Sequence, residues 1–198
     1  MRIIAGKWRG RTIRAPRGRS VRPTTDRVRE AVFSILGHEV EGSSVLDLFA
    51  GTGAMAIESL SRGAASAVLV ESSHATFVSM RGNLSALGIR DAVCLPLDYR
   101  EAVRRLSAKD RRFTLVFLDP PYGKGLVGRA AASLAAAGIL APGAVVVAER
   151  ASRDPEDPVP AGWRERVERR YGDTRITLYD IPDPRGNDAP GRREQERR

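Results

Sequence analysis

The sequence predicts an α/β protein with a mostly parallel seven-stranded sheet, helices on both faces and an antiparallel C-terminal edge strand. Three observations predict this fold. Apolar runs alternate with helical patterns between residues 43 and 148, as in repeated strand-helix units. A glycine turn follows the first run, and two β-prone runs joined at Gly172-Asp173 end the pattern. With 198 residues, 42% of them hydrophobic, the chain can form one such domain and a short appendage.

Basic residues are concentrated at the N-terminus. The formal net charge is +9, and residues 1–22 carry eight basic side chains and no acid. Such an arm is typical of proteins that bind a nucleic-acid backbone, because the planar arginine group suits phosphate. The alternative is a general abundance of arginine, since lysine occurs only at positions 7, 109 and 124. We expect a basic arm over residues 1–40, a catalytic domain over 41–181 and a disordered tail over 182–198.

Several classes of protein are disfavoured. No apolar run approaches the roughly 20 residues of a membrane span, and the N-terminus lacks an apolar signal region, so we expect a cytoplasmic protein without membrane contact. The single cysteine, Cys94, lies in an apolar run and is expected to be a packed thiol. Two histidines and one cysteine provide no metal-ligand cluster, so we expect no metal.

The arm is predicted to contain a small hairpin and a helix. The β-prone pairs Ile3-Ile4 and Thr12-Ile13 flank two glycines, and Trp8 between them either packs or stacks on a base, with packing preferred. A helix follows, capped by one of two threonines and ending at Gly37. Arg27 and Arg29 lie off its apolar stripe and are expected to face a ligand.

The first strand, Val45–Phe49, leads through Ala50-Gly51-Thr52-Gly53 into a helix over Ala54–Ser61. Glycines at such a turn let backbone amides approach a ligand closely. Phe49 stands where dinucleotide-binding turns have their first glycine, so the turn suits a cofactor without phosphate.

Acids follow the next two strands. Glu71 ends the strand Ala67–Val70, and an acid roughly 20 residues past a glycine turn typically binds the hydroxyls of a ribose. The alternative is a solvated strand end. After a helix over Ala75–Leu87 and a strand over Ala92–Leu97, Asp98 either accepts from an adenine amine or caps the helix that begins at Arg100.

The strand Phe113–Leu118 ends in Asp119-Pro120-Pro121-Tyr122. Two prolines remove two backbone donors, so the carbonyl groups here are outside the sheet ladder. A carboxylate, a carbonyl and an aromatic ring can together hold a planar amine such as that of a nucleobase. The alternative is an ordinary strand exit.

The rest of the fold pattern is a helix, a strand and a hairpin. They are expected at Val127–Leu140, Ala144–Ala148, Arg166–Tyr171 and Arg175–Asp180. The acids after the first four strands then meet at one edge of the sheet, where open α/β folds bind ligands. An adenosine cofactor beside an amine acceptor satisfies this set, and S-adenosylmethionine meets that description.

The segment from Asp47 to Gly53, followed by Asp119 to Tyr122, resembles the amino-methyltransferase pattern of class I, Rossmann-like S-adenosylmethionine-dependent enzymes. Residues 2–11, 22–30 and 53–63 resemble the RsmD family, which methylates guanine N2 in 16S (small-subunit) ribosomal RNA. The resemblance extends from residue 2 to about residue 180.

The resemblance implies a set of functional residues. The cofactor, S-adenosyl-L-methionine, would contact Asp47, Phe49, Ala50, Gly51, Gly53, Glu71, Ser72, Asp98, Tyr99 and Asp119. The target base would meet Asp119, Pro120, Pro121 and Tyr122 as the catalytic group. RNA would bind Arg9, Arg11, Arg22, Thr24, Thr25, Arg27 and Arg29. The expected partner is ribosomal RNA, naked or in an assembling small subunit, bound by a monomer.

Three rival functions remain open. An adenine-N6 DNA methyltransferase uses the same corner but usually carries a separate target-recognition domain. A glutamine-amide methyltransferase of proteins would favour Asn at position 119 and needs no basic arm. A non-enzymatic RNA-binding module would have no use for acids at every predicted cofactor position.

Overall fold

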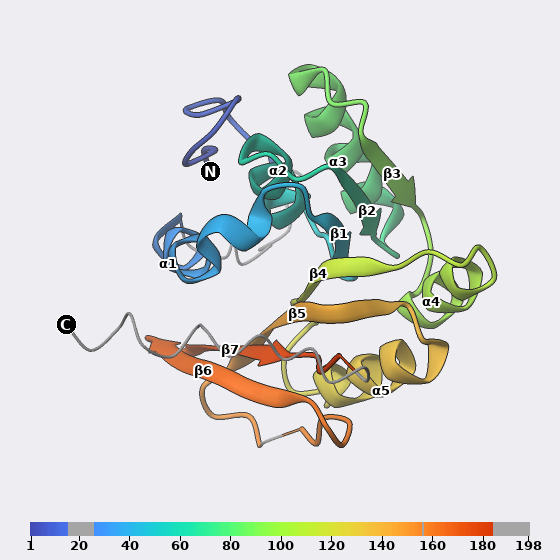
Figure 1. Ribbon diagram of the computed structural model, residues 1–198. Coiled ribbons are helices and arrows are strands. Elements are labelled where there is room, and N and C mark those ends of the chain that lie inside the picture. Colours follow the sequence, from blue (N-terminus) through green and yellow to red (C-terminus); the bar gives the residue numbers. More distant parts are fainter. Residues whose placement is uncertain (16–25, 156, 184–198) are drawn as a thin grey trace.

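The computed structural model describes residues 1–15, 26–155 and 157–183. A seven-stranded sheet in the order β3-β2-β1-β4-β5-β7-β6 forms its centre (Figure 1). The strands are β1 (Ser44–Asp47), β2 (Ser66–Val70), β3 (Ala92–Leu95), β4 (Phe113–Leu118), β5 (Leu140–Ala151), β6 (Arg164–Tyr171) and β7 (Thr174–Asp180). Strands β1 to β5 are parallel, which confirms the predicted fold class.

The strand order reverses between β1 and β4. The chain builds outward from β1 to β3 and then returns to place β4 on the other side of β1. Ligands of open α/β sheets bind beyond the carboxyl ends of the strands at such a reversal. The glycine turn after β1 and the Asp-Pro-Pro-Tyr corner after β4 therefore lie at the expected position for a site.

The antiparallel strand is β7, which pairs with both β5 and β6. Strand β7 therefore lies one position inside the edge, and β6 forms the edge itself. Strands β6 and β7 form the predicted hairpin. Which of the two lies at the edge of the sheet depends on the pairing of β7 with β5, which is distant in the sequence.

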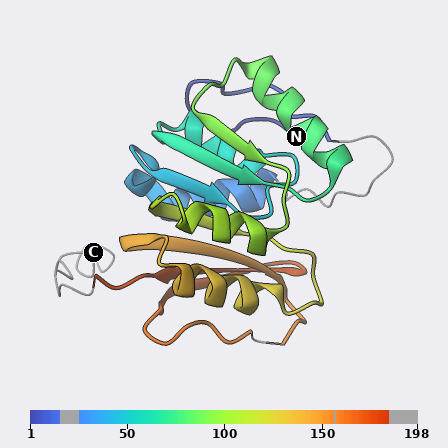
Figure 2. The same cartoon turned by 90° about the vertical axis from the view of Figure 1, so that its right-hand side faces the viewer.

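Helices cover both faces of the sheet, as Figure 2 shows. On one face α1 (Asp26–Leu36), α2 (Ala54–Ser61) and α3 (His74–Leu87) pack on side chains such as Val45. On the other, α4 (Tyr99–Ser107) and α5 (Leu126–Ala137) pack on side chains such as Leu46. Because successive strand residues point to opposite faces, the two cores are built from alternate residues of the same strands. No helix in the described ranges is long and apolar enough to span a bilayer.

The largest differences from the predicted element boundaries are at α5 and β5. Helix α5 ends at Ala137, at a Gly138 cap, and not at Leu140. Strand β5 begins at Leu140 and continues to Ala151, beyond the predicted Ala144–Ala148. The extension carries Glu149 and Arg150 into the sheet.

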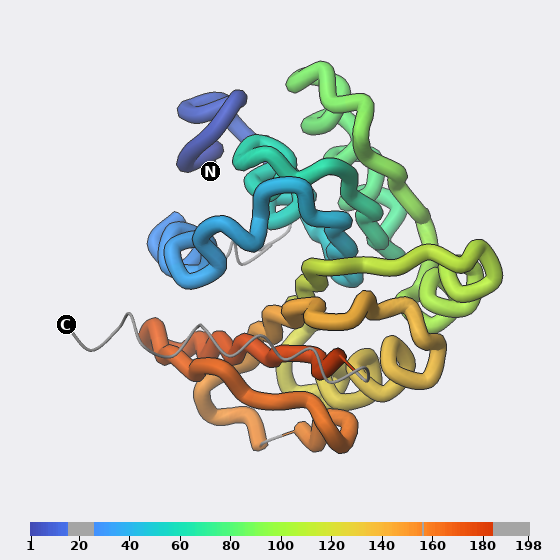
Figure 3. The backbone as a smooth tube through the Cα atoms, viewed as in Figure 1, coloured from blue at the N-terminus to red at the C-terminus, as the bar shows by residue number. Residues whose placement is uncertain are grey.

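The N-terminal arm is packed against the domain and lies beside α2 (Figure 3). Its predicted hairpin is one antiparallel bridge between Arg2 and Thr12, with a hydrogen bond from Ile3 N to Arg11 O (3.0 Å). Ile3 and Ile13 are 2% and 1% exposed. Trp8 packs partly buried against the same core, as preferred. Residues 1–15 are therefore part of the folded domain.

A buried carboxylate on α2 anchors the arm. Glu58 is fully buried and accepts hydrogen bonds from the backbone N–H groups of Ile4 (2.8 Å) and Ala5 (3.0 Å). It also forms an ion pair with Arg62 (2.8 Å) and lies 3.7 Å from Arg29 Nε. Buried charges need such partners, so the arm completes an ion-pair network.

Candidate active site

The glycine turn after β1 is fixed to both neighbouring strands. Leu48 N donates to Phe117 O (3.1 Å) at the end of β4, and Ala50 N donates to Val70 O (2.8 Å) at the end of β2. Gly53 caps α2 with φ +82°, and a Cβ there would lie 3.1 Å from Leu69 Cδ2. Only glycine fits this position without strain.

Glu71 lies at this turn, as expected for acids that follow neighbouring parallel strands. Its Oε2 accepts from Gly51 N (3.1 Å), and its Oε1 accepts from Ser73 N (2.6 Å). The carboxylate is thereby held against the glycine turn, beside the exposed Ser72. A carboxylate has about four lone-pair sites, so it keeps the capacity to accept from ligand hydroxyl groups.

Asp47 is a buried carboxylate at the end of β1. It is 2% exposed, and its Oδ2 atom has no hydrogen-bond partner. Burial raises the pKa of Asp47 to about 7, the Ala56 and Phe49 backbone amides oppose the rise, and the charge of Glu71 adds to it. Buried polar atoms are normally hydrogen-bonded, so this oxygen is suited to a ligand donor.

The two predicted residues after β3 have contacts within the fold. Asp98 Oδ1 accepts from Arg100 N (2.9 Å), so in this structure the carboxylate caps α4, while its contact with adenine remains a prediction. Tyr99 is 4% exposed, and its ring packs 5.4 Å from that of Phe49, centroid to centroid. The ring thus packs in the core, while the Tyr99 hydroxyl has no hydrogen-bond partner within the described residues, so the cofactor contact of Tyr99 remains a prediction.

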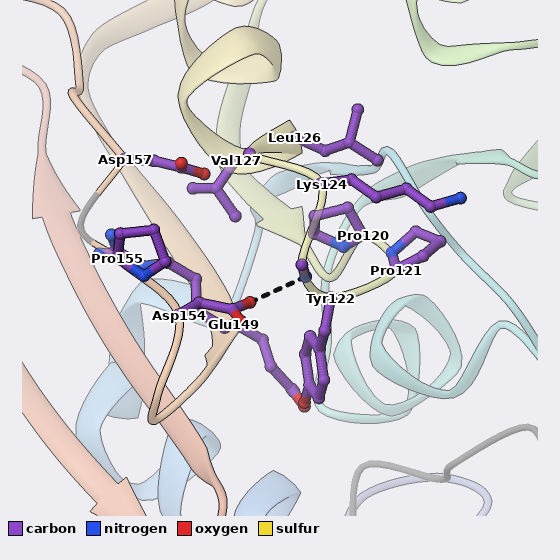
Figure 4. A pocket seen from close by; sticks show the side chains of 13 residues that line it. Pro120, Pro121, Tyr122, Lys124, Leu126, Val127, Glu149, Asp154, Pro155 and Asp157 are labelled. Carbon is purple, nitrogen blue, oxygen red and sulfur yellow. Dashed lines mark hydrogen bonds between the residues drawn. The ribbon is translucent and has the colours of Figure 1, made fainter.

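The corner after β4 presents its residues unequally. Pro120 is buried, Pro121 is exposed, and Asp119 and Tyr122 are half-buried. The Tyr122 hydroxyl donates to Glu149 Oε1 (2.6 Å) and lies 3.4 Å from Thr174 Oγ1. Burial and the Glu149 hydrogen bond raise the pKa of Tyr122, so the phenol stays neutral. Figure 4 shows the Tyr122 ring directed toward Glu149.

A pocket of about 410 Å³, counting its open mouth, lies behind this corner. Three acids that were not predicted line it: Glu149, Asp154 and Asp157. Asp154 Oδ2 accepts from Gly123 N (3.0 Å, dashed in Figure 4), and Asp157 Oδ2 accepts from Gly128 N (3.2 Å). Glu149 directly follows an apolar run, as the predicted acids Glu71 and Asp119 do, so the same sequence pattern applies to it.

The predicted RNA-binding residues are exposed, buried or outside the described part of the chain. Arg9, Arg11 and Arg27 are exposed, and Arg11 Nη2 donates to Ala86 O (2.8 Å), which holds the arm against α3. Arg22, Thr24 and Thr25 lie outside the described residues. Their binding to RNA remains a prediction.

Arg29 corrects the prediction for α1. Its side chain is fully buried, pairs with Asp26 (3.1 Å) and donates to the carbonyl of Arg2. With Glu58 it forms the ion-pair network beneath the arm. Arg29 was expected to be exposed because it lies off the apolar stripe of α1. Residues at the start of the chain cover this side of the helix, so Arg29 stabilises the fold and does not face a ligand.

One side chain that was not predicted connects the arm to the glycine turn. Asn83 on α3 is 4% exposed, and its Oδ1 accepts from Arg14 N (3.0 Å). Its Nδ2 donates to Arg14 O and to Thr52 O, both at 3.0 Å. A single buried amide therefore holds the basic arm and the candidate cofactor turn in one arrangement.

The strand order, the glycine turn and the corner after β4 define the fold as that of class I S-adenosylmethionine-dependent methyltransferases. An RNA methyltransferase from Salinibacter ruber, solved with S-adenosyl-L-homocysteine, has this fold. It superposes with a TM-score of 0.60 at 20% identity, over 81% of this chain and 94% of that one.

The family model described as "Conserved hypothetical protein 95" matches residues 1–180, so the chain belongs to this family, the RsmD family. The Escherichia coli K12 protein "Ribosomal RNA small subunit methyltransferase D" is 36% identical over 179 residues, which cover 90% of this chain and 89% of that protein. The solved structure of Escherichia coli yhhF gives a TM-score of 0.83 at 35% identity, covering 92% and 98% of the two chains.

Proposed function

We propose that the protein transfers the methyl group of S-adenosylmethionine to the exocyclic N2 amine of a guanine in small-subunit ribosomal RNA. The observation that carries this proposal is the Asp119-Pro120-Pro121-Tyr122 corner, placed beside the glycine turn where the strand order reverses. The name of the Escherichia coli relative and the exposed arginines of the N-terminal arm support ribosomal RNA as the substrate.

The residues at the strand ends fit the cofactor. Asp47 offers a buried acceptor without a partner, and Glu71 offers carboxylate oxygens at the glycine turn. When bound, S-adenosylmethionine supplies an electrophilic methyl group on a sulfonium. Asp47 and Glu71 would hold its polar groups, with Glu71 accepting from the ribose hydroxyls.

The corner would position the amine. An exocyclic amine shares its lone pair with the base, so it needs orientation and acceptors for its hydrogens. The Asp119 carboxylate and the Pro120 carbonyl are the two acceptors, and the Tyr122 ring offers a face for stacking, worth about 1 to 3 kcal/mol. Asp119 or a water molecule receives the proton that leaves the amine.

The test uses small ribosomal subunits and their naked RNA, both from cells that lack this gene. We expect the wild-type protein to incorporate labelled methyl groups, and nucleoside analysis to identify N2-methylguanosine. The Asp119→Ala variant should abolish transfer and bind S-adenosylmethionine nearly normally, whereas Asp91→Ala, at an exposed position beyond the opposite edge of the sheet, should transfer normally.

Two of the rival functions give different results in this test. N6-methyladenosine as the product would favour the adenine enzyme, and absence of cofactor binding would favour a binding module. Undiminished turnover by Asp119→Ala would remove Asp119 from the mechanism.

A further inference from the structure

Two carboxylates lie on adjacent strands at the corner. Leu118 of β4 is paired with Ala148 of β5 in the parallel sheet. Asp119 and Glu149 directly follow these two residues, so they are neighbours across the two strands. Besides burial and the Glu149 hydrogen bond, the charges of Glu149 and Asp119 raise the pKa of Tyr122. The Glu149 carboxylate accepts from the Tyr122 hydroxyl (2.6 Å), and the strand register places Asp119 next to Glu149.

Glu149 is an acidic residue that the mechanism above does not use. It is 8% exposed, and its strand neighbour on the same face, Val147, belongs to the apolar core. It lines the same pocket as Pro120 and Tyr122. A carboxylate this deeply buried is costly unless it accepts hydrogen bonds, and here it accepts one from Tyr122 (2.6 Å).

The acceptors at this corner match the hydrogen-bond donors of guanine. The Watson–Crick edge of guanine presents the N2 amine and, next to it, the N1–H group, whereas the adenine edge presents an amine next to an unprotonated N1. With the amine at Asp119 and Pro120, the carboxylate of Glu149, which follows the paired residue of the adjacent strand, can accept from N1–H. A carboxylate has about four lone-pair sites, so Glu149 can accept from Tyr122 and from the base together.

We propose that Glu149 determines base specificity by accepting the N1–H of the target guanine. This inference rests on the proposed function. A base with an unprotonated ring nitrogen at this place would bring a lone pair against a buried carboxylate, and such unmatched polar contacts discriminate strongly between substrates.

The test compares guanine with 2-aminopurine at the mapped target position of the small-subunit RNA. 2-Aminopurine keeps the amine at C2 but has an acceptor at N1. We expect the wild-type protein to prefer guanine in kcat/KM. The Glu149→Gln variant, whose amide can donate to N1, should reduce this preference by about 10- to 100-fold.

Tyr122→Phe is the matched control, because it removes the hydroxyl that contacts Glu149 and keeps both the ring and the carboxylate. It should retain the guanine preference even where its overall rate falls, and S-adenosylmethionine binding by both variants verifies that they fold. An unchanged preference in Glu149→Gln would overturn the inference, as would an equal loss of preference in Tyr122→Phe. A wild-type protein that methylates no guanine would overturn the proposed function and this inference together.

Discussion

The Tyr122 hydroxyl donates to Glu149 Oε1 across 2.6 Å and so joins the loop after β4 to strand β5. Removing this donor in Tyr122→Phe should lower the free energy of unfolding by about 1 to 2 kcal/mol, because a hydrogen bond to a charged group is lost at a half-buried position. Urea denaturation measures the change. Tyr171→Phe is the control, since the Tyr171 hydroxyl makes no hydrogen bond within the described residues, and an equal loss there would contradict the prediction.

Asp47 should make stability depend on pH. Its pKa is raised from 3.8 to about 7, so between about pH 4 and pH 7 the folded state retains a proton that the unfolded state has released. Stability is therefore highest below this window and falls as the pH rises through it, by about 4 kcal/mol in total. Asp47→Asn should abolish this component, which urea denaturation at a series of pH values would detect.

The control for Asp47 is Asp91→Asn, because Asp91 is exposed before β3. Its stability should follow the wild-type curve across the same pH range. Parallel curves for wild type and Asp47→Asn would show that Asp47 does not titrate in this window.

Local periodicity predicted most of the fold. Strand β4 and helix α2 have the predicted bounds, since each is a single uninterrupted run with one clear period. The turn after β1 and the position of Glu71 at the same sheet edge also followed, because glycine content and strand ends are visible along the chain. These features depend on residues near one another in sequence or on the geometry common to parallel sheets.

Contacts between distant segments were not predictable in the same way. Arg29 was expected to face a ligand, but a docked segment covers it, and no local pattern reveals docking. Asn83 was not among the predicted residues for the same reason, although it holds both the arm and the glycine turn. Glu149, in contrast, was missed although it directly follows the predicted end of the fifth strand at Ala148, in the same position as the acids that were predicted.

Gly6 should be essential for docking of the arm. Lys7 N donates to Ser61 O (2.8 Å) beside it, and a Cβ on Gly6 would lie only 1.7 Å from that same oxygen. Gly6→Ala should therefore separate the arm from α2 and lower the free energy of unfolding by about 2 to 4 kcal/mol. Urea denaturation measures the loss, and limited trypsin digestion at Lys7 and Arg9 detects the released arm.

Gly10 provides a closely matched control. It has φ +80°, against +79° for Gly6, but a Cβ there meets nothing within 4 Å. Gly10→Ala should show only the backbone strain, about 1 to 2 kcal/mol, and leave the arm resistant to trypsin. Equal effects of the two substitutions would mean that the close approach to Ser61 is unimportant.

Exposed arginines of the arm and α1 should set the salt dependence of RNA binding. Deleting residues 1–22 is an unsuitable test, because it would also remove the buried Ile3 and Ile13. Arg9→Gln combined with Arg27→Gln removes two exposed charges and leaves the core intact. The slope of log affinity against log salt should become shallower by about 0.7 to 0.9 for each arginine that contacts a phosphate.

Arg111→Gln controls for net charge, because Arg111 is exposed just before β4, at the sheet edge opposite the candidate site. Affinity for small-subunit ribosomal RNA, measured by filter binding between about 50 and 200 mM salt, gives the slope for each variant. Phosphate contacts at Arg9 and Arg27 predict a shallower slope for the double variant. Arg111→Gln should then keep the wild-type slope. Equal slopes in all three proteins would place the phosphate contacts elsewhere, and equal flattening in both variants would show a general charge effect in place of a defined binding surface.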